Sequence, residues 1–320
     1  MIVKTNDLDG IELLVCITHL FRVERLRYLS DVLCSLYGLG VARTDVFVFT
    51  DTDNLDDLSI LRRLFSKFES RSMSVSISSH PEVKSDPRML PWMHKALLKQ
   101  KQADLHRPYT HYLYVEDDML FSSGNLRYFL EFRPALKPFG LLPGMVRYEY
   151  NDTDHDIFTA GQLGKQDLVK KTRIICGDTD FIGLDEPYAA MFLLDREMMD
   201  EYGSSSSFEV EASRGVVGWG YIQRSAMGLT WENVPPGFRS RHVVPLRSRT
   251  TIPDAMCWMK HLPGRYTNDY SDTSNFVLGK TRMDEIFMDF AEDDRQTPYI
   301  GSSLFGVGRL LVQVEHHEPG

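Results

Sequence analysis

Apolar residues in the first third of the chain follow two alternating patterns. Short apolar runs rich in β-branched and aromatic residues predict buried strands over 11–18, 46–50, 73–78 and 111–115. Between them, apolar residues at helical spacing or helix-forming composition predict helices over 25–37, 58–68 and 91–105. This strand–helix alternation indicates an α/β fold with a mostly parallel sheet, right-handed crossovers and helices on both faces.

The second half of the chain is less regular. We expect a strand to begin at Phe139 and a helix to cover residues 195–202. Residues 149–180 are polar, and the glycine- and serine-rich segment 203–207 predicts a flexible loop. Beyond residue 288, the pattern predicts only a C-terminal tail.

Composition narrows the classes of protein that the chain can belong to. A hydrophobic fraction of 42% and a charged fraction of 25% are ordinary for a globular protein, and a net charge of −9 argues against a nucleic-acid-binding surface. No apolar run approaches the roughly 18 residues that span a bilayer, so we expect no transmembrane segment. With no signal-peptide pattern near the start, we expect a cytoplasmic protein, with peripheral membrane contact left open.

The four cysteines are widely spaced and form no CxxC pair. This spacing argues against structural zinc and against a disulfide framework. We therefore expect buried free thiols at Cys16, Cys34, Cys176 and Cys257.

Three carboxylates, Glu116-Asp117-Asp118, directly follow the predicted strand 111–115. Ligands of open α/β sheets bind at the carboxyl ends of the strands, where these acids are expected. Their mutual repulsion calls for a cation or a hydrogen-bond network, and Mg²⁺ or Mn²⁺ commonly shares oxygen ligands with substrate phosphates. The pattern favours a metal–diphosphate site; the alternative is a strand-end turn capped by Asp117 or Asp118.

A second acidic motif, Asp51-Thr52-Asp53, also ends an apolar strand and could itself hold a metal. It is similar to the phosphoaspartate signature of haloacid-dehalogenase-type phosphatases. Leu55 stands where that signature has Thr or Val. This departure weakens the phosphatase interpretation.

The run Tyr114-Val115-Glu116-Asp117-Asp118-Met119 resembles the DXD-type motif of GT-A-fold glycosyltransferases, in the Glu-Asp-Asp version of the Golgi N-acetylglucosaminyltransferases. The resemblance covers residues 11–265 in architecture and only short stretches in sequence. It implies a GT-A-like, Rossmann-like fold in a single merged domain. Its parts would be a nucleotide-sugar-binding half, an acceptor-binding and lid half, and a tail, at 1–135, 136–288 and 289–320.

The same resemblance implies a reaction. A UDP- or GDP-sugar would bind through Mn²⁺ or Mg²⁺, and its sugar would pass to a saccharide or glycoconjugate acceptor. Asp118 would be the direct metal ligand, Asp117 would contact the ribose or sugar, and Glu116 would support the base or ribose. Many such enzymes supply another metal ligand near the C-terminus, for which His261 is the first candidate and His242 the alternative.

Further donor-binding candidates lie near the predicted strand ends and flank His261. They are Thr18, Arg22, Asp51, Trp92, Lys95, Lys260 and Arg265. Guanidinium and ammonium groups suit phosphate, and a proline-started helix favours an anion at its N-terminus. The structural alternatives are a solvated helix start for Arg22, a turn residue for Asp51 and a core side chain for Trp92.

The catalytic base is the least determined part of the sequence. An inverting transferase needs a carboxylate to deprotonate the acceptor. Related bacterial enzymes carry Glu-Asp before an arginine, but segment 218–224 has Arg224 and no acid. Glu209 and Glu211 are the base candidates, with Asp180 as a further possibility, and retaining chemistry stays open.

Three alternative functions remain at this point. Trp219 could form a floor for an acceptor sugar or a packed turn. The expected acceptor residues therefore do not decide which class of protein the chain belongs to. A metal-dependent phosphatase, a nucleotidyltransferase and a non-catalytic nucleotide-sugar-binding relative stay open. The nucleotidyltransferase is disfavoured because residues 17–26 lack the glycine-rich loop that it requires.

Overall fold

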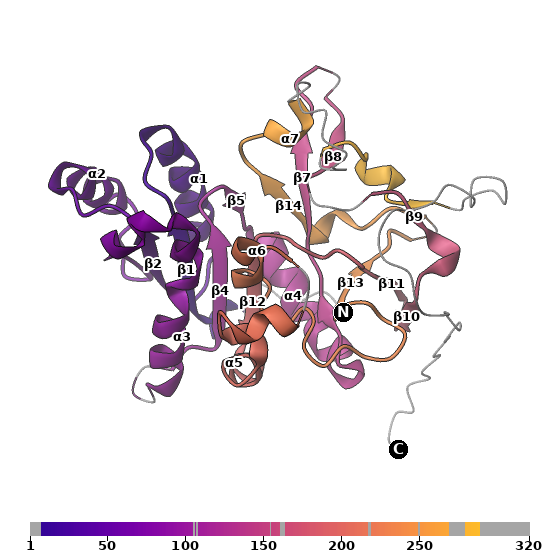
Figure 1. The fold of residues 1–320 in the computed structure, drawn as a ribbon. Helices are drawn as coiled ribbons and strands as arrows, with labels where there is room; N and C mark the ends of the chain where they lie inside the picture. Colours follow the sequence, from indigo (N-terminus) through magenta and orange to yellow (C-terminus); the bar gives the residue numbers. More distant parts are fainter. Residues whose placement is uncertain are drawn as a thin grey trace. The chain divides into compact units, whose positions relative to one another are not determined.

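A five-stranded sheet in the order β12-β4-β1-β2-β3 organises the first part of the computed structural model (Figure 1). The structure describes residues 8–104, 106, 108–153, 155–160, 164–216, 219–248, 250–268 and 279–288. Four parallel strands form most of this sheet: β1 (Glu12–His19), β2 (Arg43–Thr50), β3 (Met73–Ser79) and β4 (His111–Glu116). The four predicted strands and their parallel arrangement are therefore confirmed.

The helices between these strands bury one apolar side. Helix α1 (Leu26–Tyr37) buries Leu29, Val32, Leu33 and Leu36. Burial of each such side chain contributes about 1.5–3 kcal/mol. Helix α2 (Leu55–Phe65) begins three residues before the predicted start because the Asn54 side chain accepts hydrogen bonds from two backbone N–H groups of its first turn. Helix α3 (His94–Ala103) begins later than predicted, after a 3₁₀ segment (Pro87–Trp92) that contains Pro91.

The chain forms two compact units that are not consecutive in sequence. The first unit comprises Met1–Arg127, Tyr188–Glu232 and Met259–Pro263, and the second comprises the remaining segments. Two returning segments therefore join the unit that contains the first four strands of the main sheet. The expected tail at 289–320 lies outside the described residues.

The first returning segment adds an antiparallel edge strand to the main sheet. Strand β12 (Met191–Asp195) pairs with β4, and Asp195 caps α5 (Arg196–Gly203), close to the predicted helix. Short helical segments follow at Ser206–Phe208, Ala212–Gly215 and α6 (Tyr221–Ser225). The segment 203–207, predicted as a loop, thus ends one helix and starts a 3₁₀ turn.

The second returning segment, Met259–Pro263, brings a short strand beside the residues that follow the acidic triplet. Strand β14 (Trp258–His261) pairs antiparallel with β5 (Met119–Leu120), placing Lys260 opposite Leu120 and His261 opposite Met119. Because β5 directly follows the acidic triplet, this pairing determines what faces the triplet.

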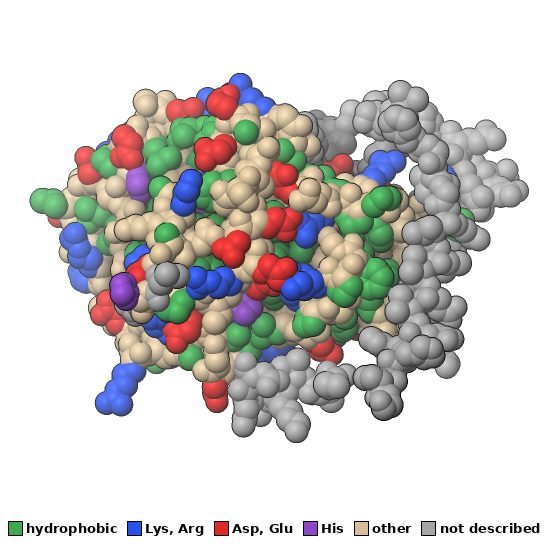
Figure 2. Space-filling view, turned by 90° about the horizontal axis from the view of Figure 1, so that it is seen from below, with side chains coloured by type: hydrophobic (Ala, Val, Ile, Leu, Met, Phe, Trp, Pro, Cys, Tyr) green, Lys and Arg blue, Asp and Glu red, His purple; other side chains and the backbone are tan. Residues whose placement is uncertain are grey.

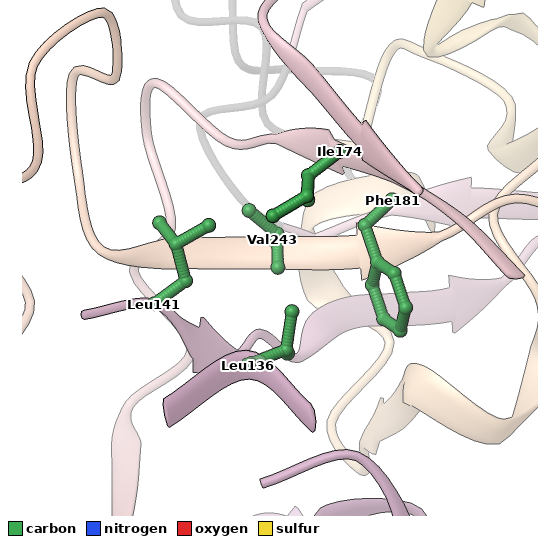
Figure 3. Packing of buried hydrophobic residues seen from close by; sticks show 5 residues of the cluster. All are labelled: Leu136, Leu141, Ile174, Phe181 and Val243. Carbon is green, nitrogen blue, oxygen red and sulfur yellow. The ribbon is translucent and has the colours of Figure 1, made fainter. Parts of the chain in front are cut away.

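The second unit is built on a sheet in the order β10-β11-β13-β6, with bounds Arg173–Cys176, Thr179–Gly183, His242–Pro245 and Leu142–Pro143. The end of α4 (Ser123–Leu136) packs on it, and Leu136, Leu141, Ile174, Phe181 and Val243 form a buried cluster (Figure 3). Further short elements are β7 (Val146–Tyr150), β8 (Ile157–Thr159), β9 (Gln166–Asp167), α7 (Arg265–Asn268) and β15 (Phe287–Met288). The polar region 149–180 therefore contains strands, which its composition did not indicate.

The four cysteines are free, but their exposure differs from the expectation. Cys16 and Cys257 are buried, Cys176 is half-buried, and Cys34 is exposed on α1. Within the described parts of the chain, no helix has the length and apolar character that crossing a bilayer requires. Acidic and basic side chains are interspersed on the face shown in Figure 2.

Candidate functional site

The acidic triplet lies at the carboxyl end of β4, beside the end of β1. Glu116 pairs with Thr18 in the parallel register, and the Asp117 N–H donates to the Thr18 carbonyl at 3.2 Å. On its other side, the Glu116 N–H donates to the carbonyl of Ala190 at 3.2 Å. The expected position at the ligand-binding edge of the sheet is therefore the one found.

Asp117 is the most enclosed of the three acids. Arg25 donates to its carboxylate through Nε at 3.0 Å and also through Nη2, and His19 Nδ1 lies 2.5 Å from its Oδ2. An imidazole at the end of β1 and a guanidinium from the 3₁₀ turn just before α1 thus stabilise this buried carboxylate. Asp117, expected to contact ribose or sugar, has its oxygens on protein groups here. Arg25 and His19 were not among the predicted site residues.

Asp118 links the triplet to Arg25 and His261. Its Oδ2 accepts from Arg25 Nη2 at 2.9 Å and lies 3.6 Å from His261 Nε2, while its buried Oδ1 has no hydrogen-bond partner among the described residues. Burial alone would raise the pKa of Asp118, but the hydrogen bonding and charge of His261, followed by Arg25, lower that pKa to about 2. The Arg25 pKa rises above its usual value, chiefly through its hydrogen bond to Asp117.

Backbone pairing brings His261 to this position. In addition to the β5–β14 ladder, the Leu262 N–H donates to the Asp118 carbonyl at 2.9 Å. The His261 side chain is only 3% exposed. The structure thus brings together Asp118 and the histidine that the sequence ranked first as a metal ligand.

The alternative histidine and one donor candidate lie in the second unit. His242 is on β13, where burial, and then Arg241, lower its pKa to about 4. Arg265 begins α7, and its Nη2 donates to the Tyr266 hydroxyl at 3.0 Å. Lys260, by contrast, is in the first unit, next to His261 on β14.

The side chains around Asp118 can be tested for their fit to a hard cation such as Mg²⁺ or Mn²⁺. No group of three His, Cys, Asp or Glu side chains able to enclose a metal occurs among the residues that the structure describes. Two ligands of one cation, each about 2.1 Å from it, lie roughly 3–4 Å apart. The 3.6 Å between Asp118 and His261, together with the partnerless Oδ1, fits a cation held by two side chains and completed by substrate or water oxygens.

Glu116 connects the triplet to a group of aromatic rings. The Tyr188 hydroxyl donates to Glu116 Oε1 at 3.0 Å. The Tyr188 ring lies 5.5 Å from that of Trp219, which in turn lies 5.7 Å from Trp231. From the sequence, Trp219 is expected either to form an apolar floor beneath an acceptor sugar or to pack in a turn. The connection through Tyr188 to the triplet was not visible in sequence.

The remaining predicted residues near β1 and β2 have local partners. Asp51 accepts from the Phe21 N–H at 2.8 Å, so it braces the loop after β1. The Thr18 hydroxyl lies 3.0 Å from that of Tyr114, and exposed Arg22 donates to the Phe21 carbonyl at 2.5 Å.

Trp92 and Lys95 lie inside the first unit. The Trp92 indole N–H donates to the Tyr221 carbonyl at 3.1 Å. The Lys95 amine donates to the Tyr202 hydroxyl and the Ser207 carbonyl, and burial holds the pKa of Lys95 well below its usual value. Rings of Trp92, Tyr202 and Phe208 lie within 5.2 Å of this amine. These contacts place Lys95, predicted to bind the donor, among protein partners.

A cavity of about 460 Å³ opens within the first unit, a size typical of small-molecule sites. Charged side chains and aromatic rings line it: Asp86, Arg88, Glu211, Arg214, Trp219, Tyr221 and Arg224. We call it the Arg88–Trp219 cavity. Of the three base candidates, Glu211 lines this cavity, Glu209 is an exposed residue just before it in sequence, and Asp180 pairs with Arg173 in the second unit.

No protein-family model matches the chain, and no curated protein matches it. Among solved structures, the chain is similar to the crystal structure of S. aureus TarS 1-349, with a TM-score of 0.34 and 13% sequence identity. The match covers 68% of this chain and 56% of that one, so this chain spans a little over half of that structure's length.

Proposed function

We propose that the chain is a metal-dependent glycosyltransferase that moves a sugar from a UDP- or GDP-sugar to a saccharide or glycoconjugate acceptor. The observation that carries the proposal is the Glu116–Asp118 triplet at the carboxyl edge of a β3-β2-β1-β4 sheet, with His261 beside Asp118. The DXD-like sequence and the GT-A-like strand order support the same conclusion. Fold alone would not, because this architecture serves many activities.

Asp118 and His261 would hold the cation, Mn²⁺ or Mg²⁺. When bound, such a cation neutralises the diphosphate that leaves as the sugar is transferred. Arg25 keeps the Asp117 and Asp118 carboxylates in one orientation through hydrogen bonds to both. Arg22 and Lys260 are the proposed phosphate partners among the exposed or half-buried cations near the triplet.

Glu211 is the proposed base if transfer inverts the sugar. In that step the Glu211 carboxylate takes the proton of the acceptor hydroxyl. The new glycosidic bond forms as the bond between the sugar and the diphosphate breaks, and the electron pair of that bond leaves on the diphosphate. Glu211 is preferred to Glu209 because its side chain lines the cavity.

Thermal unfolding tests the donor part of this proposal. UDP, GDP and CMP are each added with and without Mn²⁺ to the wild type, to Asp118→Asn and to the matched control Asp53→Asn, an exposed acid after β2. A ligand at about 100 times its Kd stabilises the folded protein by about 2.7 kcal/mol. We expect one diphosphate to raise Tm only with Mn²⁺, in the wild type and the control but not in Asp118→Asn.

Two results would contradict the proposal. The first is that no nucleoside diphosphate stabilises the wild type with Mn²⁺. The second is metal-dependent release of phosphate from simple phosphate esters, which would support the phosphatase alternative instead.

A further inference from the structure

We infer that the Arg88–Trp219 cavity is the acceptor subsite, and that it takes a saccharide unit carrying one anionic group, a phosphate or a carboxylate. The inference rests on the proposed function and adds to it the class of the acceptor. Three features carry it: the aromatic wall, the balance of charge in the lining, and the connection to the acidic triplet.

Trp219 supplies a ring of the kind on which a pyranose packs. Aromatic side chains offer a large apolar face, and a sugar ring presents a face of C–H groups to it. The Trp219 side chain is half-buried and held by its ring neighbours Tyr188 and Trp231 at 5.5 and 5.7 Å. The Tyr221 ring lines the same cavity. Such a preformed wall binds a sugar without having to be ordered first.

The charged groups of the lining leave one cation in excess. Asp86 accepts two hydrogen bonds from Arg88, at 2.6 and 3.0 Å, and Glu211 lies 3.2 Å from Arg214. Each carboxylate of the lining therefore has its own guanidinium. Arg224 is the third guanidinium, so the lining has a formal charge of +1 in a chain whose net charge is −9. A ligand with one anionic group complements this balance.

Arg224 is held in a fixed position. It is 5% exposed, and its Nη1 donates to the Val210 carbonyl at 3.1 Å and to the Ser213 hydroxyl. Its guanidinium carbon lies 5.6 Å from the centre of the Tyr221 ring. A fixed, partly desolvated guanidinium recognises phosphate or carboxylate more strongly than a mobile surface one does.

The cavity wall is also connected to the proposed donor site. Trp219 contacts the Tyr188 ring, and the Tyr188 hydroxyl binds Glu116 of the triplet. All of these residues belong to the first unit. An acceptor sugar on Trp219 would therefore lie on a wall that is continuous with the residues proposed to hold the donor.

The test measures saccharide binding in the absence of donor and metal. The probes are the methyl glycosides of glucose, galactose and N-acetylglucosamine, their 6-phosphates, the uronates of the first two, and inorganic phosphate. Saturation-transfer NMR detects binding, and titration of tryptophan fluorescence gives Kd. We expect at least one anionic sugar to bind at least fivefold more tightly than its neutral parent and than inorganic phosphate.

Variants place that binding in the cavity. Trp219→Ala and Arg224→Gln should each weaken it at least fivefold, whereas Arg27→Gln, on an exposed part of α1, should change it by less than twofold. The Tm of each variant confirms that it is folded. Stabilisation by the nucleoside diphosphate with Mn²⁺ should persist in both cavity variants.

The outcomes separate this inference from the proposed function. If no sugar binds, if inorganic phosphate binds as tightly as the sugar phosphates, or if neutral sugars bind equally well, the inference is overturned while diphosphate stabilisation can still hold. Loss of diphosphate stabilisation in both cavity variants would assign the cavity to the donor and also overturn it. If anionic sugars bind but no diphosphate does, the proposed function fails, and with it the acceptor role of the cavity.

Discussion

His261 Nε2 lies 3.6 Å from Asp118 Oδ2, although the two residues come from widely separated parts of the chain. A short antiparallel pairing makes this possible, since β14 runs beside β5 and Leu262 donates to the Asp118 carbonyl. The two residues are each 3% exposed. A cation shared by them would therefore connect the end of β4 to a segment that returns to the first unit late in the sequence.

Arg25→Met should destabilise the protein because it removes the guanidinium that donates hydrogen bonds to the buried Asp117 carboxylate and leaves the His19 imidazole beside it. Removing one partner of a buried ion pair costs about 3–5 kcal/mol, and the partial exposure of Arg25 reduces this to about 2–3 kcal/mol. Urea unfolding measures the change. Arg27→Met, exposed on α1, is the matched control and should stay within about 0.5 kcal/mol. Equal effects of the two substitutions would contradict the role given to Arg25.

His111 predicts a loss of stability in mild acid. Burial lowers its pKa from 6.5 in the unfolded chain to about 4 in the folded protein, and Asp195 opposes the shift. Between these values the unfolded chain binds the extra proton, so the free energy of unfolding rises with pH over this window and is lost as pH falls through it. The full difference is on the order of 3 kcal/mol.

The variant His111→Phe isolates this contribution from those of other histidines. Urea unfolding at several values between pH 4 and pH 6.5 should give a shallower pH dependence for the variant than for the wild type. Identical pH dependences would show that His111 does not titrate as the buried side chain that the structure describes.

The cysteines should differ in reactivity. Cys34 is exposed, whereas burial raises the pKa of the Cys16 and Cys257 thiols and keeps both in the unreactive form. A thiol-specific reagent followed by mass spectrometry should modify Cys34 in the native protein. Cys16 and Cys257 should react only after denaturation. Rapid native labelling of Cys16, in the central strand β1, would contradict the fold.

Gly228→Ala should cost about 2 kcal/mol because the position combines a left-handed backbone with close packing. Its φ is +53°, and an added Cβ would lie 2.9 Å from the Phe192 Cβ. Gly10→Ala is the control, since in the described part of the chain no heavy atom lies within 4 Å of an added Cβ there. Thermal unfolding compares the two, and no difference between them would contradict the packing of Gly228 on β12.

Sequence patterns predicted the central sheet because each buried strand is a local apolar run. The ends of the strands were harder to predict than the strands themselves. Strand β2 begins at Arg43 rather than Val46, because Thr44 pairs with Met73 on β3. The second unit was largely missed. Its strands are short, and residues such as Ile174 and Phe181 become core only when distant segments pack together.

The residues of the candidate site also differ in whether a local sequence pattern or a contact between distant segments reveals them. The triplet and His261 are predicted from local sequence, and the structure places Asp118 beside His261. Arg25 is not predicted, because its role depends on the pairing of β1 with β4, which brings the turn before α1 to Asp117. Lys95 remains a predicted donor ligand, and its hydrogen bonds to Tyr202 and Ser207, which lie far along the chain, could not be predicted from local sequence.

Release of nucleoside diphosphate tests the central claim most directly. The protein is incubated with a panel of UDP- and GDP-sugars and a mixture of oligosaccharide acceptors, with Mn²⁺ or with a chelator, and UDP and GDP are quantified. The account predicts release from one class of donor, dependent on Mn²⁺ and at least a hundredfold lower in Asp118→Asn, with Asp53→Asn unchanged. Release that survives both the chelator and Asp118→Asn, or no release from any donor, would contradict it.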